Sequence, residues 1–313
     1  TDGAYTALRF TSASAGLSTV ENLWIVGTNA STPAITLLKF DTQAAYNVVR
    51  HCTLAYASKL IELDGVYVTK LIGNSLSNAD VYWSWDDTTG GAADLYSSGN
   101  TYGTSLIGTQ AMVQAAAPGV RIVGDCWETQ QHTKPALELL TGTVYADVDA
   151  RFENSGGVTV GTSVEAWLRL RAKDSYTTAT NRFLRVDASG SAYVSHSQFL
   201  LPALDATKTA ISASGACYVS GSDLKNWGVG AIFASIGSLS SSTVRGCTTG
   251  VQFNSGSTAV LGNDLVWSGT TTNIVNNSNG SATAPGSFTA SLTGCTTAPT
   301  AFCRFEVSNG VVR

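Results

Sequence analysis

Apolar and small polar residues recur along this chain in short blocks at a nearly fixed spacing. Each block reads apolar, any residue, a small residue or histidine, a small polar residue, any residue, and usually a second apolar residue. Three copies follow one another at a constant interval, namely "VSHSQF" from Val194, "VSGSDL" from Val219 and "VRGCTT" from Val244. Such fixed-period self-similarity is the sequence signature of a repeat protein.

Further copies of this hexapeptide extend the repeat over most of the chain. Most intervals are close to the one between these three copies, whereas the first is longer and the last is clearly shorter. Short β-type runs separate the copies, and only residues 105–118 have a mildly helical composition. The other copies begin at Val20, Val49, Leu71, Ser97, Ile122, about 147, about 170 and Val260.

This spacing predicts an all-β protein, a right-handed parallel β-helix of about ten coils over residues 1–272. One coil needs about this many residues for its short strands and turns, and equivalent residues then stack roughly 4.8 Å apart. The fourth hexapeptide position should form a ladder at an inward bend, where Asn or Ser can hydrogen-bond buried turn backbone. The hexapeptide is therefore predicted to be a coil corner, with this position filled by Cys52, Asn74, Asn100, Asp125, Ser197, Ser222, Cys247 and Asn263.

The composition suits a protein that works outside the cell or on a virion. Charged residues make up 13% of the chain, against about 25% in an average soluble domain, so Ser, Thr, Asn and Gly must dominate the surface. The net charge of −4 gives no general attraction for nucleic acid or anionic lipid. No apolar run of about 18 residues is present, so no insertion into a membrane is expected.

Cysteines and histidines point to structure rather than to a metal or cofactor. None of the six cysteines forms a CxxC pair. A chain of this length can build its own hydrophobic core without disulfide bonds, so most of the cysteines are expected to be small buried residues. His51, His132 and His196 lack metal-ligand spacing, and His51 and His196 share one hexapeptide position. No nucleotide-binding or hydrolase fingerprint is present. We therefore expect no metal site and no cofactor.

The coil pattern resembles the pectate-lyase-like parallel β-helices, and among them the bacteriophage tailspike and tail-fibre proteins. The segment 286–297, followed by Pro299 and Val311–Val312, is similar to a short β module that ends many phage tail proteins. Residues 286–313 are accordingly predicted to begin such a C-terminal module, which looks incomplete. A polar, Gly/Asn/Ser-rich stretch at 273–285 is predicted to be the linker before it.

The resemblance implies a protein that binds or cleaves host surface polysaccharide. Sugar-binding grooves are expected along the helix or between the subunits of a homotrimer. The chain would then belong to a virion tail, outside the cell, together with other tail proteins. The family fixes no catalytic positions, since these vary among its members.

Two glutamates are the first catalytic candidates, because the repeat brings them together. Glu128 and Glu153 are one full repeat apart, and they follow Trp127 and Phe152. If the register holds, Tyr102, Trp127 and Phe152 form one ladder and the glutamates form a second. Carboxyl groups about 5 to 5.5 Å apart suit a retaining glycosidase, and roughly 6.5 to 9.5 Å suits an inverting one. The alternative is a pair of solvated side chains on a turn.

The run "WSWDD" at 83–87 is a candidate sugar platform. Aromatic rings stack on sugar CH faces, and carboxylates accept hydroxyl hydrogen bonds. Alternation places Trp83, Trp85 and Asp87 on one face of a strand, with Asp86 beside them. The alternative is a core tryptophan followed by a turn.

A third candidate is the alternating run that places Asp147, Asp149 and Arg151 on one strand face. Arg151 could hold a uronate or sialate carboxylate, or it could belong to a surface ion pair of small energetic value. A similar alternation is more typical of a solvated face, and it involves Arg169, Arg171 and Lys173.

Three functions remain open from the sequence. The first is a receptor-binding tailspike that recognises host polysaccharide, with or without depolymerising it. The second is a non-enzymatic structural or adhesive virion fibre, and the third is a secreted polysaccharide lyase or hydrolase. For the first, the candidate catalytic residues are Glu128, Glu153 and Asp87, and the candidate sugar-binding residues are Trp83, Trp85, Trp127, Tyr102, Asp86 and Arg151.

Overall fold

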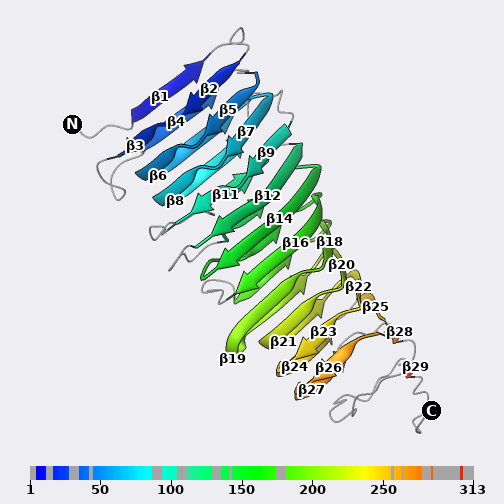
Figure 1. The fold of residues 1–313 in the computed structure, drawn as a ribbon. Coiled ribbons are helices and arrows are strands. Elements are labelled where there is room, and N and C mark those ends of the chain that lie inside the picture. The colour runs from blue at the N-terminus through cyan, green and yellow to red at the C-terminus, as the bar shows by residue number, and fades with distance from the viewer. Residues whose placement is uncertain are drawn as a thin grey trace. The chain divides into compact units, whose positions relative to one another are not determined.

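The chain is a stack of parallel β-strands that wind into a β-solenoid (Figure 1). The computed structural model describes residues 5–11, 17–27, 35–41, 45–86, 94–103, 111, 113–116, 118–128, 135–140, 143–173, 181–254, 257–262, 264–276, 283–284 and 304–305. Within these ranges there are strands and no α-helix, and therefore none long and apolar enough to cross a membrane. The predicted all-β parallel β-helix is confirmed.

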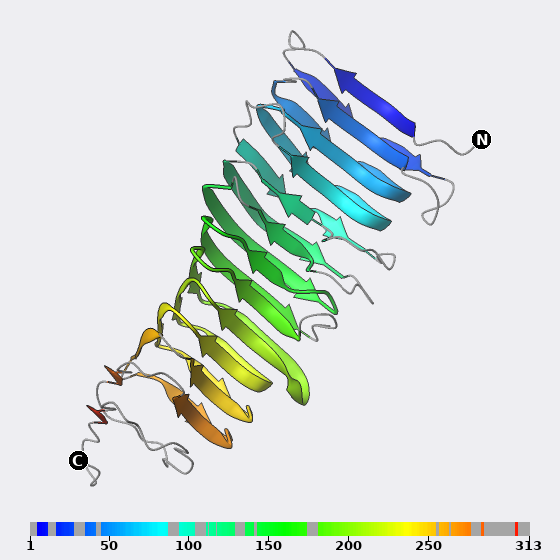
Figure 2. The ribbon, with the colours of Figure 1, turned by 180° about the vertical axis from the view of Figure 1, so that it is seen from behind.

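The chain divides into two compact units, residues 1–166 with 176–180 and residues 167–175 with 181–313. In each unit the strands pair in parallel on three faces, and the chain visits the faces in turn. Figure 2 shows these strands from behind. Because each strand pairs with the strand one coil later, a residue's nearest neighbours on a face come from the previous and the next coil.

In the first unit, several strands are long enough to run from one face to the next. The first face holds β2 (Ser18–Glu21), β5 (Asn47–Arg50), β7 (Val68–Ile72), β9 (Asp94–Ser98) and the starts of β12 (Gly119–Trp127) and β14 (Tyr145–Glu153). The second face holds β3 (Trp24–Val26), the starts of β6 (Thr53–Asp64) and β8 (Ser75–Asp86), β10 (Thr101–Tyr102) and the ends of β12 and β14. The third face holds β1 (Tyr5–Thr11), β4 (Ile35–Asp41), the ends of β6 and β8, β11 (Val113–Ala115), β13 (Leu137–Leu139) and β15 (Val158–Val160).

The second unit repeats this arrangement. Its first face holds β16 (Glu165–Lys173), β18 (Ser191–Ser195), β20 (Ala216–Ser220), β22 (Ile236–Ser240), β25 (Thr258–Leu261) and β28 (Thr283–Ala284). The second face holds the end of β16, the starts of β19 (Gln198–Ala213) and β21 (Asp223–Phe233), β23 (Thr243–Arg245) and β26 (Val266–Ser268). The third face holds β17 (Arg182–Val186), the ends of β19 and β21, β24 (Thr249–Phe253) and β27 (Thr272–Asn276), while β29 (Arg304–Phe305) pairs with β28.

The predicted corner ladder is present in the first unit. The backbone N–H of Cys52 donates to Asn74 Oδ1 (3.0 Å), that of Asn74 to Asn100 Oδ1 (2.9 Å), and that of Asn100 to Asp125 Oδ1 (2.9 Å). All four residues are buried. The ladder therefore satisfies corner amides that would otherwise be buried without a partner.

The second unit builds the same ladder from serine. The backbone N–H of Leu170 donates to Ser197 Oγ (2.9 Å), that of Ser197 to Ser222 Oγ (3.2 Å), and that of Ser222 to Ser242 Oγ (3.1 Å). These three serines are buried. The hexapeptides from Val194 and Val219 are thus confirmed as successive corners. Asn263 lies outside the described residues.

The hexapeptide from Val244 is a correction to the predicted register. Val219 pairs with Leu239, and Leu224 pairs with Val244, so Val244 lies within the second face and Cys247 lies at the corner that follows this face. The coil is shorter here than the preceding one, since Asp223 pairs with Thr243 whereas Gln198 pairs with Asp223. Because coil length varies along the chain, the number of turns differs slightly from the ten predicted.

Four of the cysteines lie among the described residues, and most of these are buried, as the sequence predicts. Cys52, Cys217 and Cys247 are buried, Cys126 is half-buried, and none of the four is in a disulfide. Cys295 and Cys303 lie outside the described residues. The mildly helical stretch 105–118 contains strand β11 instead, since Val113–Ala115 pairs with β8.

The predicted boundaries at the C-terminal end stay predictions. Part of the proposed linker 273–285 is in β27 and β28. Of the proposed module 286–313, only Arg304–Phe305 is described, as β29.

The left-handed residue before each ladder position yields the first testable prediction. Gly73 (φ +60°) and Gly99 (φ +63°) occupy equivalent corners, but an added Cβ at Gly73 would lie 2.9 Å from His51 Cδ2, whereas at Gly99 it would meet nothing within 4 Å. Gly99→Ala should lower the free energy of unfolding by about 1–2 kcal/mol through its left-handed backbone alone. Gly73→Ala should lower it further.

Urea denaturation measures both variants, and a His51→Ala background supplies the control. Removal of the imidazole should bring the cost of Gly73→Ala down to that of Gly99→Ala. Equal losses for the two glycine variants in the wild-type background would show that His51 does not pack on Gly73.

Asp125 yields the second prediction. Burial raises the pKa of this carboxyl, although hydrogen bonds from Ser97 Oγ (2.5 Å), the Asn100 backbone and Tyr102 Oη (2.9 Å) oppose the shift. The folded state therefore holds the proton more tightly than the unfolded state, whose pKa is about 3.9, and stability should fall as the pH rises through the folded pKa. Asp125→Asn extends the Asn74–Asn100 ladder and removes this loss.

The free energies of unfolding of wild type and Asp125→Asn should be compared from pH 4 to pH 7. The advantage of the variant should grow as the pH rises. An advantage that shrinks with rising pH would mean that the hydrogen bonds to the carboxylate outweigh its burial.

Candidate functional site

The structure places the four predicted sugar-stacking rings inside the coils. Trp83, Trp127 and Tyr102 are 0% exposed and Trp85 is 1% exposed. The centroids of Tyr102 and Trp127 are 4.3 Å apart, and those of Trp127 and Phe152 are 4.7 Å apart, in nearly parallel planes. This confirms the predicted ladder of rings, but as part of the core, so the rings offer no stacking surface to a ligand outside.

A hydrogen-bond network satisfies two of these polar aromatic residues, Trp83 and Tyr102, whereas Trp85 Nε1 and Trp127 Nε1 are buried without a hydrogen-bond partner among the described residues. Trp83 Nε1 donates to Tyr102 Oη (3.0 Å), and Tyr102 Oη donates to the Asp125 carboxylate. Burial, followed by the charge of Asp125, raises the pKa of Tyr102 well above its usual value, so the phenol keeps its proton. Tyr102 thus links the ring ladder to the corner ladder.

Of the two aspartates of the "WSWDD" run, only Asp86 lies among the described residues. Asp86 is the last residue of β8, and its Cα pairs with that of Asp64 on the preceding coil. Asp87 lies outside the described residues. Their sugar-binding and catalytic roles stay predictions.

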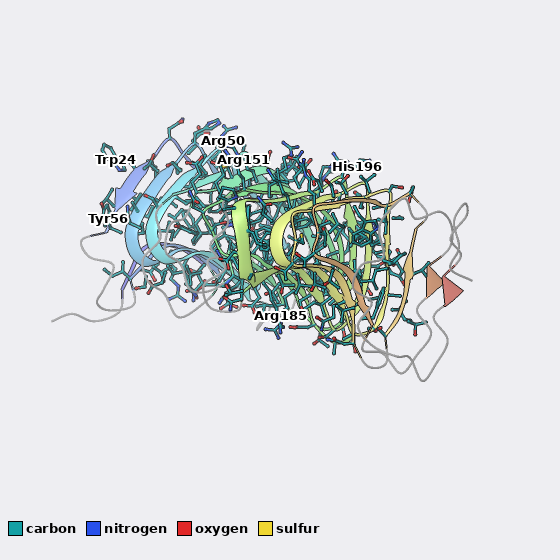
Figure 3. The ribbon with its side chains drawn as sticks, turned by 90° about the horizontal axis from the view of Figure 1, so that it is seen from below. Trp24, Arg50, Tyr56, Arg151, Arg185 and His196 are labelled. Carbon is teal, nitrogen blue, oxygen red and sulfur yellow. The ribbon has the colours of Figure 1, made fainter. Side chains whose placement is uncertain are left out.

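The structure does bring Glu128, Glu153 and Arg151 together on the outer surface of the first unit. Trp127 pairs with Phe152, so the glutamates that follow them lie beside each other on adjacent coils. Strands in a sheet are about 4.8 Å apart. Arg151 Nε donates to Glu153 Oε1 (3.0 Å), and the guanidinium forms an ion pair with that carboxylate. Figure 3 shows Arg151 at the outside of its unit.

Cys126 completes this cluster. Its Cα pairs with that of Arg151, and its Sγ lies 3.6 Å from Glu128 Oε1 as a hydrogen-bond donor. Burial, with the charge of Glu128 as the next cause, raises the pKa of this thiol to about 11. Cys126 is therefore protonated at neutral pH and is a poor nucleophile. The chemistry that this cluster can offer is that of its two carboxylates and its arginine.

The alternation predicted around Arg151 is confirmed, but the common face is not: Asp147 and Asp149 lie on the first face, and Arg151 follows the corner at Ala150, on the second face. Along β14, Asp147, Asp149 and Arg151 face outward while Val148 and Ala150 are buried. Arg121 Nε lies 3.7 Å from Asp147 Oδ2, so this part of the row is a solvated ion pair, which is typically worth little.

Sequence reasoning missed a ladder of aromatic rings on the outer surface of the second unit. The ring centroids of Trp167 and Tyr193 are 5.1 Å apart and those of Tyr193 and Tyr218 are 5.3 Å apart, with interplanar angles of 17° and 14°. Trp167 is 37% exposed and the two tyrosines are half-buried. We call Trp167, Tyr193 and Tyr218 the aromatic ladder.

The sequence did contain a pattern for this ladder. Tyr193 and Tyr218 each stand directly before the first apolar residue of a hexapeptide, and Trp167 stands before Leu168 in the same way. On a strand, the residue before an inward-facing residue faces outward. An aromatic residue at this position in successive coils is therefore an outer ladder.

A row of cations adjoins the aromatic ladder. Strand β16 alternates strictly, so Trp167, Arg169, Arg171 and Lys173 all face outward and are exposed, and Leu168, Leu170 and Ala172 are buried. Trp167 and Arg169 lie on the first face, and Arg171 and Lys173 lie past the corner at Leu170, on the second face. We call Arg169, Arg171 and Lys173 the basic row. Among the described residues, no three His, Cys, Asp or Glu side chains are grouped so that they could hold a metal ion.

No protein-family model, no curated protein and no solved structure matches the chain.

Proposed function

We propose that this chain is the β-helical part of a phage-type tailspike or tail fibre that binds a surface polysaccharide on its outer faces. The observation that carries the proposal is the aromatic ladder on the second unit. Tyr and Trp present an apolar body with a polar tip, which suits sugars. The ladder repeats at each coil on rigid strands, and a polymer with repeating units can contact each coil in the same way.

The fold and the composition of the chain support the same proposal. A β-helix is compatible with fibres that bind or depolymerise polysaccharide. The low charge content and the Ser, Thr and Gly-rich composition suit a virion or extracellular protein. In this proposal the chain works in a virion tail with other tail proteins, binds no nucleic acid and does not insert into membranes.

Self-association as a homotrimer belongs to the proposal. The terminal coils of a solenoid expose unpaired strand edges that need partners or caps, and its flat, weakly charged faces can pack against other copies of the chain. The resemblance to tailspikes points to three-fold symmetry.

Binding to purified bacterial capsule or lipopolysaccharide tests the proposed function. Trp167→Ala and Tyr218→Ala should each weaken the affinity by roughly tenfold, or about 1.4 kcal/mol, because each removes one ring from the contact surface. Titration calorimetry or biolayer interferometry measures the change.

Trp24→Ala is the matched control, since Trp24 is 80% exposed in the other unit and lies outside the aromatic ladder. It should bind as wild type does. If the ladder variants bind as tightly as wild type, the ladder is not the binding surface.

Depolymerisation is a second candidate function, and Glu128 and Glu153 are its residues. The specific observation is that they lie on adjacent coils beside Arg151. A spacing near the strand repeat suits retaining glycosidase chemistry, in which one carboxyl is the nucleophile and the other the acid and base. Arg151 could instead hold the carboxylate of an acidic sugar for a lyase reaction.

Release of reducing ends from the same polysaccharides tests this second function. Glu128→Gln and Glu153→Gln should each lower the rate by about two to four decades, as expected for loss of an acid–base group. Glu165→Gln is the control, because Glu165 is an exposed glutamate on another strand. Full turnover by both variants would remove the pair from the mechanism, and an unsaturated product would indicate a lyase. Binding without turnover in wild type would indicate an adhesive fibre.

A further inference from the structure

The strands that continue the aromatic ladder beyond Trp167 contain no ionic side chain. They are β18 (SAYVS), β20 (ACYVS), β22 (IGSLS) and β25 (TAVL), and none of them includes Asp, Glu, Lys or Arg. The first face of the first unit differs, because its outward positions include Lys70, Arg121 and Asp147. A polymer that follows the stack of the second unit along these four strands therefore meets an uncharged surface.

Serine hydroxyls follow the rings along one side. The next outward residue after Tyr193 is Ser195, and the next after Tyr218 is Ser220. Ser195 pairs with Ser220, and Ser220 pairs with Ser240, so these serines form a line along the stack, parallel to the rings. We call Ser195, Ser220 and Ser240 the serine ladder. Because a hydroxyl both donates and accepts hydrogen bonds, it suits a sugar hydroxyl in either role.

The corner separates the rings from the cations of the second face. These cations are Arg171, Lys173, Lys225 and Arg245. Arg169 is the member of the basic row that shares the first face with the rings, and it already takes part in an interaction within the protein. The surface beside the two tyrosines is therefore built for apolar contact and hydrogen bonds rather than for ion pairs.

We infer that the aromatic ladder and the serine ladder together bind a neutral polysaccharide, whose sugar units carry hydroxyl groups and no carboxylate or phosphate. This inference rests on the proposed function and specifies its ligand. An acidic polymer would lose hydration of its charged groups on this face without gaining ion pairs, and the net charge of −4 would repel it. A neutral sugar gains apolar contact from the rings and hydrogen bonds from the serines.

Opposite charges placed at one exposed position test this inference in the full chain. Ser220 is exposed in the middle of the serine ladder, so Ser220→Asp and Ser220→Lys both direct their charge to solvent. A neutral polysaccharide should lose affinity by similar factors for the two variants, because each replaces the hydroxyl. An acidic polysaccharide should bind Ser220→Lys roughly tenfold or more tightly than Ser220→Asp.

The same pair of substitutions at Ser268 is the matched control. Ser268 is exposed on β26, on the second face of the same unit, and it lies outside both ladders. Ser268→Asp and Ser268→Lys change the net charge of the chain by the same amounts. Both should bind as wild type does.

The probes are chosen by charge. Dextran, mannan and galactan are neutral, polygalacturonate, alginate and hyaluronate are acidic, and capsule and lipopolysaccharide are included as in the test of the proposed function. Biolayer interferometry measures binding at about 50 and 200 mM salt, and Trp167→Ala identifies the binding that depends on the aromatic ladder. The affinity of this ladder-dependent binding should be the same at both salt concentrations, because no ion pair contributes to it.

The remaining outcomes overturn one or both claims. Ladder-dependent binding that weakens as salt rises, or that is tighter for Ser220→Lys than for Ser220→Asp, would overturn the neutral ligand and leave polysaccharide binding in place. Binding that Trp167→Ala leaves unchanged would remove the ladder from the binding surface and overturn the inference. No binding of any probe by wild type would overturn the inference and the proposed function together.

Discussion

The structure depends on one constraint, which is that the backbone of each buried corner must find a hydrogen-bond partner. In a stack of parallel coils the partner comes from the next coil, so the side chain at a corner serves the amide of the coil before it. Asn74, Asn100 and Asp125 do this in the first unit, and Ser197, Ser222 and Ser242 do it in the second. Register therefore propagates from corner to corner, and it fixes which residues on the strands between them can form ladders.

The corner ladder could be predicted from sequence because its chemistry is local. A glycine or histidine followed by a small hydrogen-bonding residue can be recognised in each copy of the hexapeptide by itself, without knowledge of the strand pairing. The same local chemistry occurs at a second corner, however. Asn226 and Gly246 also have positive φ, and an added Cβ at Gly246 would lie 2.5 Å from Asn226 Oδ1. "VRGCTT" therefore fits the hexapeptide, and only strand pairing reveals that Cys247 belongs elsewhere.

The candidate site was harder to predict, because inner and outer ladders have the same period. Tyr102 and Trp127 are one repeat apart in the core, and Tyr193 and Tyr218 are separated by the same interval on the surface. What separates them is their position relative to the corner. The left-handed residue at the corner interrupts the in-and-out alternation of the strand. Tyr102 and Trp127 come three residues after it and face inward, whereas Tyr193 comes three residues before it and faces outward. Alternation alone predicts that Trp83 and Trp85 share one face of their strand, but it does not predict whether that face points into the core or toward solvent.

A solenoid also limits where charge can gather. Like charges at equivalent positions of adjacent coils, such as Lys225 and Arg245, lie about 4.8 Å apart and repel by roughly 1 kcal/mol in water, and Asp223 offsets this repulsion by binding Arg245. Along a strand the same charges are farther apart, and the basic row runs in this direction. The aromatic ladder runs along the stack, because rings gain from close stacking. The two directions meet at Trp167, which begins the aromatic ladder along the stack and precedes Arg169 along its own strand.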